Sequence, residues 1–163
     1  MAHISITRPR EDDLPAVAAL AWPETAVRRT KHDTVRGWFD LGQLVIAKHD
    51  GQVVGLIVAD ESFFDQTFVR HLAVAENHRR LGLGTALLRA TTERIRTERL
   101  FTATRESNFP MRMLLASLHW ENVGTVRGID DGASEMFYRA PLAAEDASPP
   151  SSARPGGAGS VEA

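Results

Sequence analysis

The stretch from Phe68 to Ile95 constrains the fold more than any other part of the chain. It begins with an apolar run, Phe68 to Val74, that is typical of a buried strand. A short basic loop follows, and two glycines, Gly82 and Gly84, lie at its end. Apolar residues then recur at positions 83, 86, 87, 90 and 95, the spacing of one helix face. A strand that leads through a tight loop into an amphipathic helix predicts a chain with both helices and a sheet.

The rest of the chain alternates between strand and helix patterns. Asp50-Gly51 lies between two apolar runs and predicts a tight hairpin, as Asp130-Asp131-Gly132 does near the end of the folded part. Phe63, Phe64 and Asp65 predict a turn. This order predicts the α/β or α+β class with a mixed sheet. We expect strands at 3–7, 44–47, 53–59, 68–74, 100–104, 125–129 and 135–139. We expect helices that carry Leu14–Ala21 (capped by Asp12 or Asp13), Val35–Leu41 (ended by Gly42), Leu83–Ile95 and Met111–Leu118.

The C-terminal segment differs in composition from the rest. Residues 141–163 are mostly Ala, Pro, Gly and Ser and include no aromatic residue. Such a segment buries too little apolar area to offset the entropy lost on ordering. We therefore predict one domain over residues 1–140 and a disordered tail over 141–163.

Composition excludes several classes of site and partner. The 163 residues include no cysteine, which excludes disulfides, thiolate metal sites and thiol nucleophiles. The net charge of −2 argues against a protein held mainly by nucleic-acid phosphates. Histidines lack metal-ligand spacing, so we expect no metal. No apolar run is long enough to span a bilayer, and the N-terminal residues lack a signal-peptide pattern. We expect a cytoplasmic protein with no membrane or nucleic-acid partner.

The loop between the central strand and helix has the features of a diphosphate site. The first turn of a helix offers free N–H groups and a partial positive charge, and Arg79 and Arg80 add to it. Glycines let an anion approach the backbone closely. The loop lacks the Lys-Ser or Lys-Thr of a Walker motif, and Leu87 stands where a dinucleotide fingerprint has its third glycine. A plain glycine-containing turn with solvated arginines remains the alternative.

The fuller pattern resembles a known family. Arg79-x-x-Gly82-x-Gly84, directly after the strand Phe68–Val74, is similar to the acyl-CoA motif of the GNAT superfamily of N-acyltransferases. Asn108-Phe109-Pro110-Met111 and the later Leu118-His119-Trp120 resemble its second motif, and the element order over residues 3–139 looks like its whole fold. The resemblance implies a mixed, mostly antiparallel sheet of about seven strands. It also implies a splayed parallel pair, Phe68–Val74 with Leu100–Thr104, and about four flanking helices.

The resemblance also implies a site for acetyl-CoA, used as co-substrate. The backbone of Leu72, Ala73 and Val74 would pair with the pantetheine arm, and Asn108 would hydrogen-bond it. Asn108 also suits a plain helix cap, and both roles are compatible. The diphosphate would lie against Arg79, Arg80, Leu81, Gly82, Leu83, Gly84 and Thr85.

The acid–base positions depart from the family pattern. Transfer to an amine requires a neutral nucleophile, and a lysine-like amine has a pKa of about 10.4. The positions that hold a Glu or a Tyr in the resembled family are Phe68, Ala103 and Leu115 here. The catalytic residues are therefore unknown. Glu61, His71 and Tyr138 are the substitutes, although each also suits a packing or surface role. We expect the amine proton to leave through water, with Glu61 or a backbone carbonyl as relay.

The sequence thus predicts an acetyl-CoA-dependent N-acetyltransferase that acts on the amine of a small molecule or peptide by direct transfer, as a monomer or homodimer. Trp38, Phe39, Phe63 and Phe64 lie in segments that line the acceptor cleft of the resembled family. Two other classes stay open. One is an acyl-CoA-binding regulatory module without turnover. The other is an interaction protein whose third helix presents arginines to an acidic partner or to nucleic acid, namely Arg89, Arg94, Arg96 and Arg99.

Overall fold

The computed structural model describes residues 3–22, 28–130 and 132–141. The tail predicted for 141–163 therefore lies, apart from Pro141, outside the described residues, as does Asp131 of the second predicted hairpin. The strands are β1 (Ile4–Thr7), β2 (Leu44–His49), β3 (Gln52–Phe63), β4 (Gln66–Val74), β5 (Leu100–Arg105), β6 (Glu121–Asp130) and β7 (Ala133–Arg139). The helices are α1 (Leu14–Ala21), α2 (Arg28–Asp40), α3 (Leu83–Thr92) and α4 (Phe109–Ser117).

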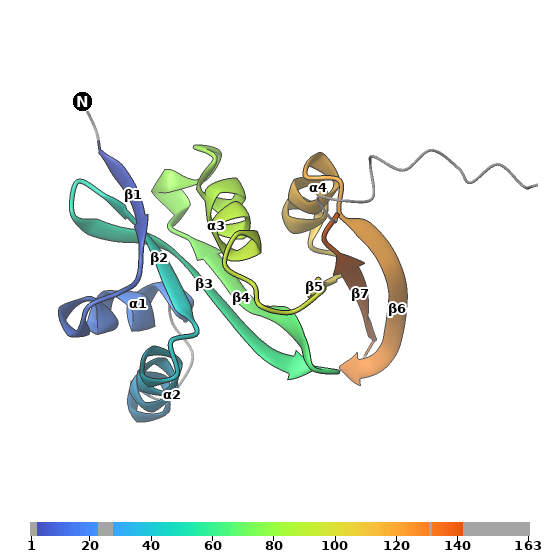
Figure 1. Ribbon diagram of the computed structural model, residues 1–163, viewed down its shortest axis with the longest axis horizontal. Coiled ribbons are helices and arrows are strands. Elements are labelled where there is room, and N and C mark those ends of the chain that lie inside the picture. Colours follow the sequence, from blue (N-terminus) through green and yellow to red (C-terminus); the bar gives the residue numbers. More distant parts are fainter. Residues whose placement is uncertain (1–2, 23–27, 131, 142–163) are drawn as a thin grey trace, which may run out of the picture.

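The strands form one mixed seven-stranded sheet in the order β1-β2-β3-β4-β5-β7-β6 (Figure 1). Every neighbouring pair is antiparallel except β4 and β5, which run parallel. The expected fold class is therefore confirmed.

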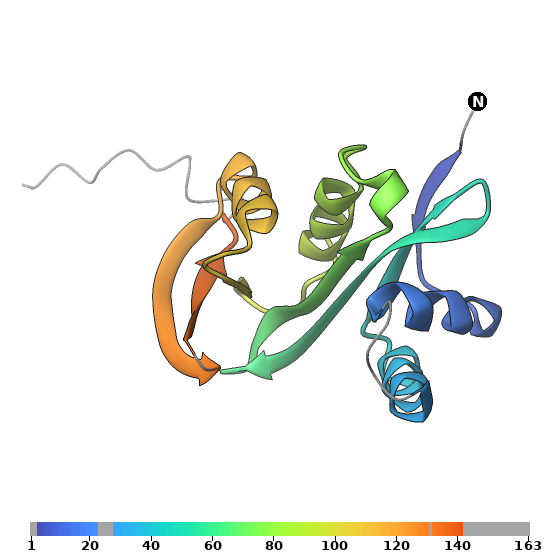
Figure 2. The same ribbon diagram turned by 180° about the vertical axis from the view of Figure 1, so that it is seen from behind.

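Helices cover both faces of the sheet (Figure 2). On one face, Leu83, Leu87 and Leu88 of α3 and Leu115 of α4 belong to one apolar core. On the other face, α1 and α2 pack on β2 and β3 in a second core, which holds Leu14, Val17, Val35, Ile46, Leu56 and Val58. Burial on two faces explains why β3 reads as a nearly continuous apolar run rather than an alternating one.

The two hairpins around β3 have left-handed turn residues. Asp50 (φ 48°) and Gly51 (φ 84°) form the turn that the sequence predicts. The second turn is shorter than expected, because β3 continues to Phe63 and only Phe64 (φ 51°) and Asp65 (φ 60°) reverse the chain. β3 therefore includes Glu61, which the sequence places at the end of this strand.

Asp13 is the N-cap residue of α1, as predicted, but its side chain makes no capping hydrogen bond to that helix. A 3₁₀ turn, Glu11–Asp13, precedes α1, and the Asp13 carboxylate accepts a hydrogen bond from the Arg10 N–H at 2.8 Å. The Lys48 Nζ of β2 lies 2.7 Å from the same carboxylate. Burial alone would raise the pKa of Asp13, but the Arg10 N–H and Lys48 outweigh it and hold the pKa below its usual value. Asp13 thus caps the 3₁₀ turn and ties it to the sheet.

Further predictions about helices α2 and α3 need correction. α2 is longer than expected, and Leu41 follows it with 72% of its surface exposed instead of joining its apolar face. α3 ends at Thr92, so Arg94, Ile95, Arg96 and Arg99 lie beyond the helix. The arginine-rich helix face expected for an acidic partner or nucleic acid is therefore not formed.

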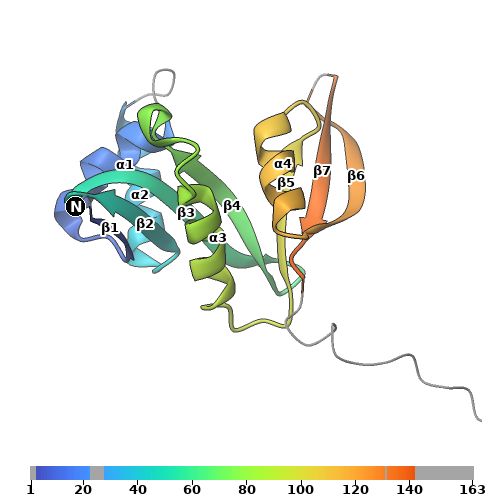
Figure 3. The ribbon, with the colours of Figure 1, turned by 90° about the horizontal axis from the view of Figure 1, so that it is seen from above.

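The parallel pair separates after a short contact. β4 and β5 pair only at Thr67–Leu100, Phe68–Phe101 and Val69–Thr102. The β3–β4 register shifts between the partners of Val69 and His71, so Arg70 is the extra residue of a bulge, and bulges bend strands. Figure 3 shows the two strands diverging beyond this point. We call the space between their diverging ends the β4–β5 gap.

Candidate functional site

The β4 edge of the gap offers unpaired backbone groups. The Ala75 N–H donates to the Val54 carbonyl at 2.8 Å, which fixes the alternation of the antiparallel β3–β4 pair. Ala73 accordingly directs its backbone groups to β3, whereas Leu72 and Val74 direct theirs to the gap. Of the three residues predicted to pair with a pantetheine arm, Leu72 and Val74 therefore have the suitable orientation.

The loop after β4 forms a cradle of N–H groups, which we define as Arg80–Thr85. Arg80 (φ 63°) and Gly82 (φ 78°) are left-handed, and Gly82 is the N-cap of α3. Within the described residues, none of the N–H groups from Arg80 to Thr85 has a hydrogen-bond acceptor. The first intrahelical bond of α3 comes from Ala86, which donates to Gly82. A run of free donors at a helix N-terminus suits an anion with several oxygens.

Side chains around the cradle support the same chemistry. Leu83 is buried (2% exposed) and anchors the start of α3 in the core, while Leu81 is exposed. Arg80 is exposed, and the Arg79 Nε donates to the Val74 carbonyl at 3.3 Å, so Arg79 lies between the cradle and the β4 edge. A cation in this place complements a diphosphate.

Gly84 is more confined than a surface turn. A Cβ at this position would lie 3.0 Å from Cδ2 of Leu114 in α4. The absence of a side chain therefore lets α4 approach the first turn of α3, as well as leaving the N–H groups accessible.

Asn108 lies on the far side of the gap, at the start of α4. Its Oδ1 accepts a hydrogen bond from the Met111 N–H at 3.3 Å, so the predicted cap is present. Its side chain is exposed, and its Nδ2 has no partner among the described residues. The amide nitrogen is thus available to a ligand in the gap while the oxygen holds the helix.

Two of the three apolar positions of the expected acid–base set, Leu115 and Phe68, lie in packed surroundings, and the third, Ala103, pairs with Phe137 across β5 and β7. Leu115 is fully buried in the core beneath α4. The rings of Phe68 and Phe63 lie 5.0 Å apart, and Phe63 also contacts Phe64, Phe101 and Phe137 at 5.1–5.8 Å between centroids. We call these five rings the phenylalanine cluster. Because Thr67 and Val69 face α3, Phe68 and this cluster belong to the opposite face.

Sequence reasoning missed two members of this cluster, Phe101 and Phe137. They are 36 positions apart and come together only because β5 pairs with β7. Both residues lie in segments that the sequence predicts as strands, but no pattern in the sequence signals that these two strands pair. Among the aromatic residues expected at a cleft, Phe63 and Phe64 join the cluster, Trp38 packs with Trp22, and Phe39 contacts Arg36.

His71 lies on β4 in an aromatic stack on the same face as α1 and α2. Its ring is 6.0 Å from both Trp22 and Trp38, and these two indoles are 5.2 Å apart. Burial lowers the pKa of His71 below its ordinary value, although a hydrogen bond with the Ala21 backbone opposes the shift. The Nε2 atom is buried without a partner. At neutral pH the imidazole is thus uncharged, but its free nitrogen is buried away from solvent.

The other two catalytic candidates lie elsewhere. Tyr138 is 6% exposed, and its hydroxyl hydrogen-bonds the Met136 sulfur at 3.9 Å. Glu61 lines a cavity beside the closed end of the β4–β5 pair, next to Thr67. The structure therefore does not bring Glu61, His71 and Tyr138 together into one acid–base group.

The described residues include no cluster of His, Asp or Glu side chains suited to a metal ion. Within the same ranges, every helix is too short or too polar to traverse a bilayer.

Comparison with known families and structures agrees with this geometry. The model of the acetyltransferase (GNAT) family matches residues 14–120. No curated protein sequence matches the chain. Among solved structures, a GNAT-family acetyltransferase from Bacillus cereus is 25% identical with a TM-score of 0.76, and the match covers 85% of this chain and 96% of that one.

Two further structures show the same fold. A ribosomal-protein-alanine N-acetyltransferase from Brucella melitensis is 24% identical with a TM-score of 0.71, covering 85% of this chain and 99% of the other. A protein from Salmonella typhimurium, determined with its cofactor acetyl-CoA, is 17% identical with a TM-score of 0.70, covering 86% and 99%.

Proposed function

Because the chain belongs to the GNAT acetyltransferase family, we propose that it transfers the acetyl group of acetyl-CoA to an amine of a small molecule or peptide. The observation that carries the proposal is the cradle, whose N–H groups from Arg80 to Thr85 have no acceptor among the described residues. It lies directly beside the β4–β5 gap. A diphosphate in the cradle and an extended arm along β4 fit this arrangement.

Each group at the gap has a separate binding role in this proposal. Leu72 and Val74 pair with the amides of the arm as an added strand would, and the Asn108 Nδ2 donates to it from the other side. Arg79 moves its Nε from the Val74 carbonyl to a phosphate oxygen. Acetyl-CoA supplies the thioester, and the chain positions it where β4 and β5 diverge.

We infer direct transfer in a ternary complex. The amine nitrogen forms the new amide bond as the carbon–sulfur bond breaks, its proton passes to water, and the thiol departs as thiolate. Positioning carries most of the acceleration, since Phe68, Ala103 and Leu115 provide no acid or base. Glu61 lies at the closed end of the strand pair, so a backbone carbonyl is the better relay for the proton.

The surface beside the gap favours an acceptor with an apolar body. The phenylalanine cluster and the Trp22–Trp38–His71 stack both lie on the α1 and α2 face. Phe64 at the hairpin tip is 85% exposed. An aromatic or aliphatic group next to the reacting amine would pack on these rings. We keep the expectation of a cytoplasmic protein that acts as a monomer or homodimer.

The test combines acetyl-CoA binding with turnover. We expect Gly84→Asp to weaken acetyl-CoA binding by about 2 kcal/mol, because it would add a negative charge in the first turn of α3, next to the diphosphate. Gly84→Ala is the matched control, since it brings the same Cβ toward Leu114 without the charge. Isothermal titration calorimetry measures affinity, and thiol release over a panel of amines measures transfer. Equal affinities for the two folded variants would contradict the cradle assignment.

A second function is favoured by one observation, the apolar residues at all three expected acid–base positions. It is an acyl-CoA-binding regulatory module that does not catalyse transfer. Tight acetyl-CoA binding without thiol release for any amine of the panel would select this alternative.

A further inference from the structure

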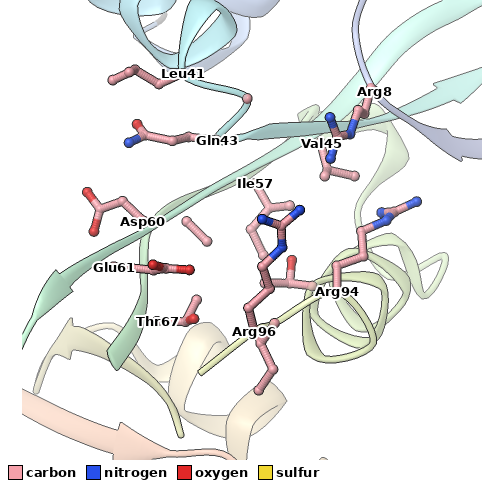
Figure 4. Close-up of a pocket in the computed structure, with 14 residues that line it drawn as sticks. Arg8, Leu41, Gln43, Val45, Ile57, Asp60, Glu61, Thr67, Arg94 and Arg96 are labelled. Carbon is pink, nitrogen blue, oxygen red and sulfur yellow. The ribbon is translucent and has the colours of Figure 1, made fainter. Parts of the chain in front are cut away.

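A cavity of about 540 Å³ lies at the end of α3 opposite to the cradle (Figure 4). Its floor includes Ile57, Thr67 and Thr91, which are almost completely buried. The segment after α3 and the entry to β2 form its rim. The ten residues of α3 separate it from the cradle by roughly 15 Å, at 1.5 Å per residue.

Three guanidinium groups surround this cavity without carboxylate partners. Arg8, Arg94 and Arg96 line it, and none of them forms an ion pair within the described residues. Figure 4 shows Arg8 and Arg94 on one side of the cavity and Glu61 on the other. Three uncompensated positive charges at one concave site attract an anion.

The two carboxylates at the cavity differ in their partners. Asp60 accepts hydrogen bonds from the Ser62 hydroxyl at 2.6 Å and from Arg70 at 3.2 Å, so its charge is compensated. Glu61 is exposed and forms no ion pair within the described ranges. Opposite charges thus line the same cavity and are held apart.

The hydroxyl groups of Thr67 and Thr91 on the cavity floor already donate hydrogen bonds within the protein. Thr91 donates to the Leu87 carbonyl at 2.9 Å. Thr97 donates to the Arg99 carbonyl at 2.9 Å, so in the 2.6 Å contact between Thr67 and Thr97 the proton comes from Thr67. Both floor oxygens can therefore only accept further hydrogen bonds. The floor oxygens and Glu61 can bind a hydrogen-bond donor of a ligand, and the arginines can bind its carboxylates.

We propose that this cavity binds a free acidic amino acid, a small zwitterion with two carboxylates and one ammonium group. The carboxylates pair with the guanidinium groups of Arg8, Arg94 and Arg96, which suit bidentate contacts. The ammonium group lies against Glu61 and the floor oxygens. Because Thr67 belongs to the closed part of the β4–β5 pair, the site is separate from the gap and does not depend on the proposed transfer.

The experiment titrates the full chain with L-glutamate, glutarate and inorganic phosphate at low ionic strength, with calorimetry as the readout. We expect saturable L-glutamate binding with a Kd below about 1 mM. Glutarate carries the same two carboxylates but no ammonium group, so we expect it to bind at least about fivefold more weakly.

Variants test which side chain contacts the carboxylates of the ligand and which contacts its ammonium group. Arg96→Gln should weaken L-glutamate and glutarate by about tenfold each, whereas Glu61→Gln should weaken only L-glutamate. Arg89→Gln and Glu98→Gln are matched controls at exposed positions outside this cavity, and both should bind L-glutamate as the unmodified chain does. Circular dichroism verifies that all four variants fold.

Several results would overturn the proposal. No heat with L-glutamate up to about 10 mM would remove the site. Binding that Arg96→Gln leaves unchanged would place the ligand elsewhere. Phosphate that binds as tightly as L-glutamate, or a Glu61→Gln variant that weakens glutarate equally, would show a simple anion site instead.

Discussion

At the residue scale, His71 shows how burial fixes a protonation state. Its ring packs against two indoles that also stack on each other, and its Nε2 atom is buried without a partner. A charged imidazolium there would lose solvation without gaining an acceptor at Nε2, which is why burial lowers the pKa of His71. This environment suits packing better than proton transfer, because the free nitrogen is buried away from solvent.

The lowered pKa predicts a pH dependence of stability. In the unfolded chain His71 takes up a proton as pH falls through about 6.5, whereas the folded chain takes it up only at lower pH. The unfolded state then binds more protons, so the free energy of unfolding should fall as pH drops below 6.5 and stay constant with respect to this group above it.

Urea denaturation between pH 8 and pH 5 measures this slope. His71→Phe keeps the ring stack and removes the titrating group, so we expect a flatter profile than for the unmodified chain. His32→Phe on the exposed side of α2 is the control and should retain the original slope. Equal slopes for His71→Phe and the unmodified chain would show that His71 does not contribute.

At the element scale, the end of α4 contains a strained residue. His119 follows the helix with a φ of 60°, and its N–H donates to the Ala116 carbonyl at 3.0 Å. The Trp120 N–H donates to the Leu115 carbonyl, also at 3.0 Å. This is the left-handed helix ending in which glycine is the usual residue. The left-handed conformation costs a residue with a Cβ about 1–2 kcal/mol.

We predict that His119→Gly stabilises the protein by about 1 kcal/mol, because relief of the left-handed strain exceeds the added chain entropy of glycine. The melting temperature should rise by about 2–4 °C. His119→Ala keeps the Cβ and removes only the imidazole, so it should give no gain. A rise of the same size for the alanine variant would assign the effect to the imidazole rather than to the backbone.

Element types were more predictable than element ends. The helical spacing of apolar residues located α3, but Thr91 and Thr92 turn their hydroxyls back to the Leu87 and Leu88 carbonyls and the helix stops there. β3 continues through polar residues to Phe63 because its partner β4 is available, not because its own sequence alternates. Because both element ends were predicted wrongly, the side chains near them were assigned wrong positions. The cavity lined by Arg94, Arg96 and Glu61 was therefore not predicted.

At the scale of the whole molecule, features formed by one continuous segment could be predicted from the sequence. Features assembled from distant segments could not be predicted from residue patterns alone. The cradle depends on a continuous segment, Arg79–Thr85, so its residues and its place after β4 could be predicted. The cap by Asn108 is also local. The gap depends on a parallel pair of only three residue contacts and on a bulge at Arg70, and the splayed pair was predicted from the family resemblance rather than from a pattern in either strand. The phenylalanine cluster likewise needs four strands to assemble.

The last prediction concerns where the folded domain ends. Ala140 is 4% exposed, and its N–H donates to the Leu100 carbonyl at 2.9 Å. Beyond Pro141 the sequence is dominated by Ala, Pro, Gly and Ser, which offer little apolar area to bury. We predict that truncation after Pro141 leaves the melting temperature and the acetyl-CoA affinity unchanged. Scanning calorimetry and titration calorimetry on both chains provide the comparison.

A second truncation, after Tyr138, shows whether the boundary is sharp. It removes the buried Ala140 with its hydrogen bond to β5, and the Arg139 side chain that pairs with Glu121 at 2.6 Å. The lost backbone bond and the exposed end of the β5–β7 pair should cost about 1–2 kcal/mol, or several degrees in melting temperature. If truncation after Pro141 lowered the melting temperature as much as truncation after Tyr138, residues 142–163 would contribute to the folded domain, and the boundary predicted from composition would be wrong.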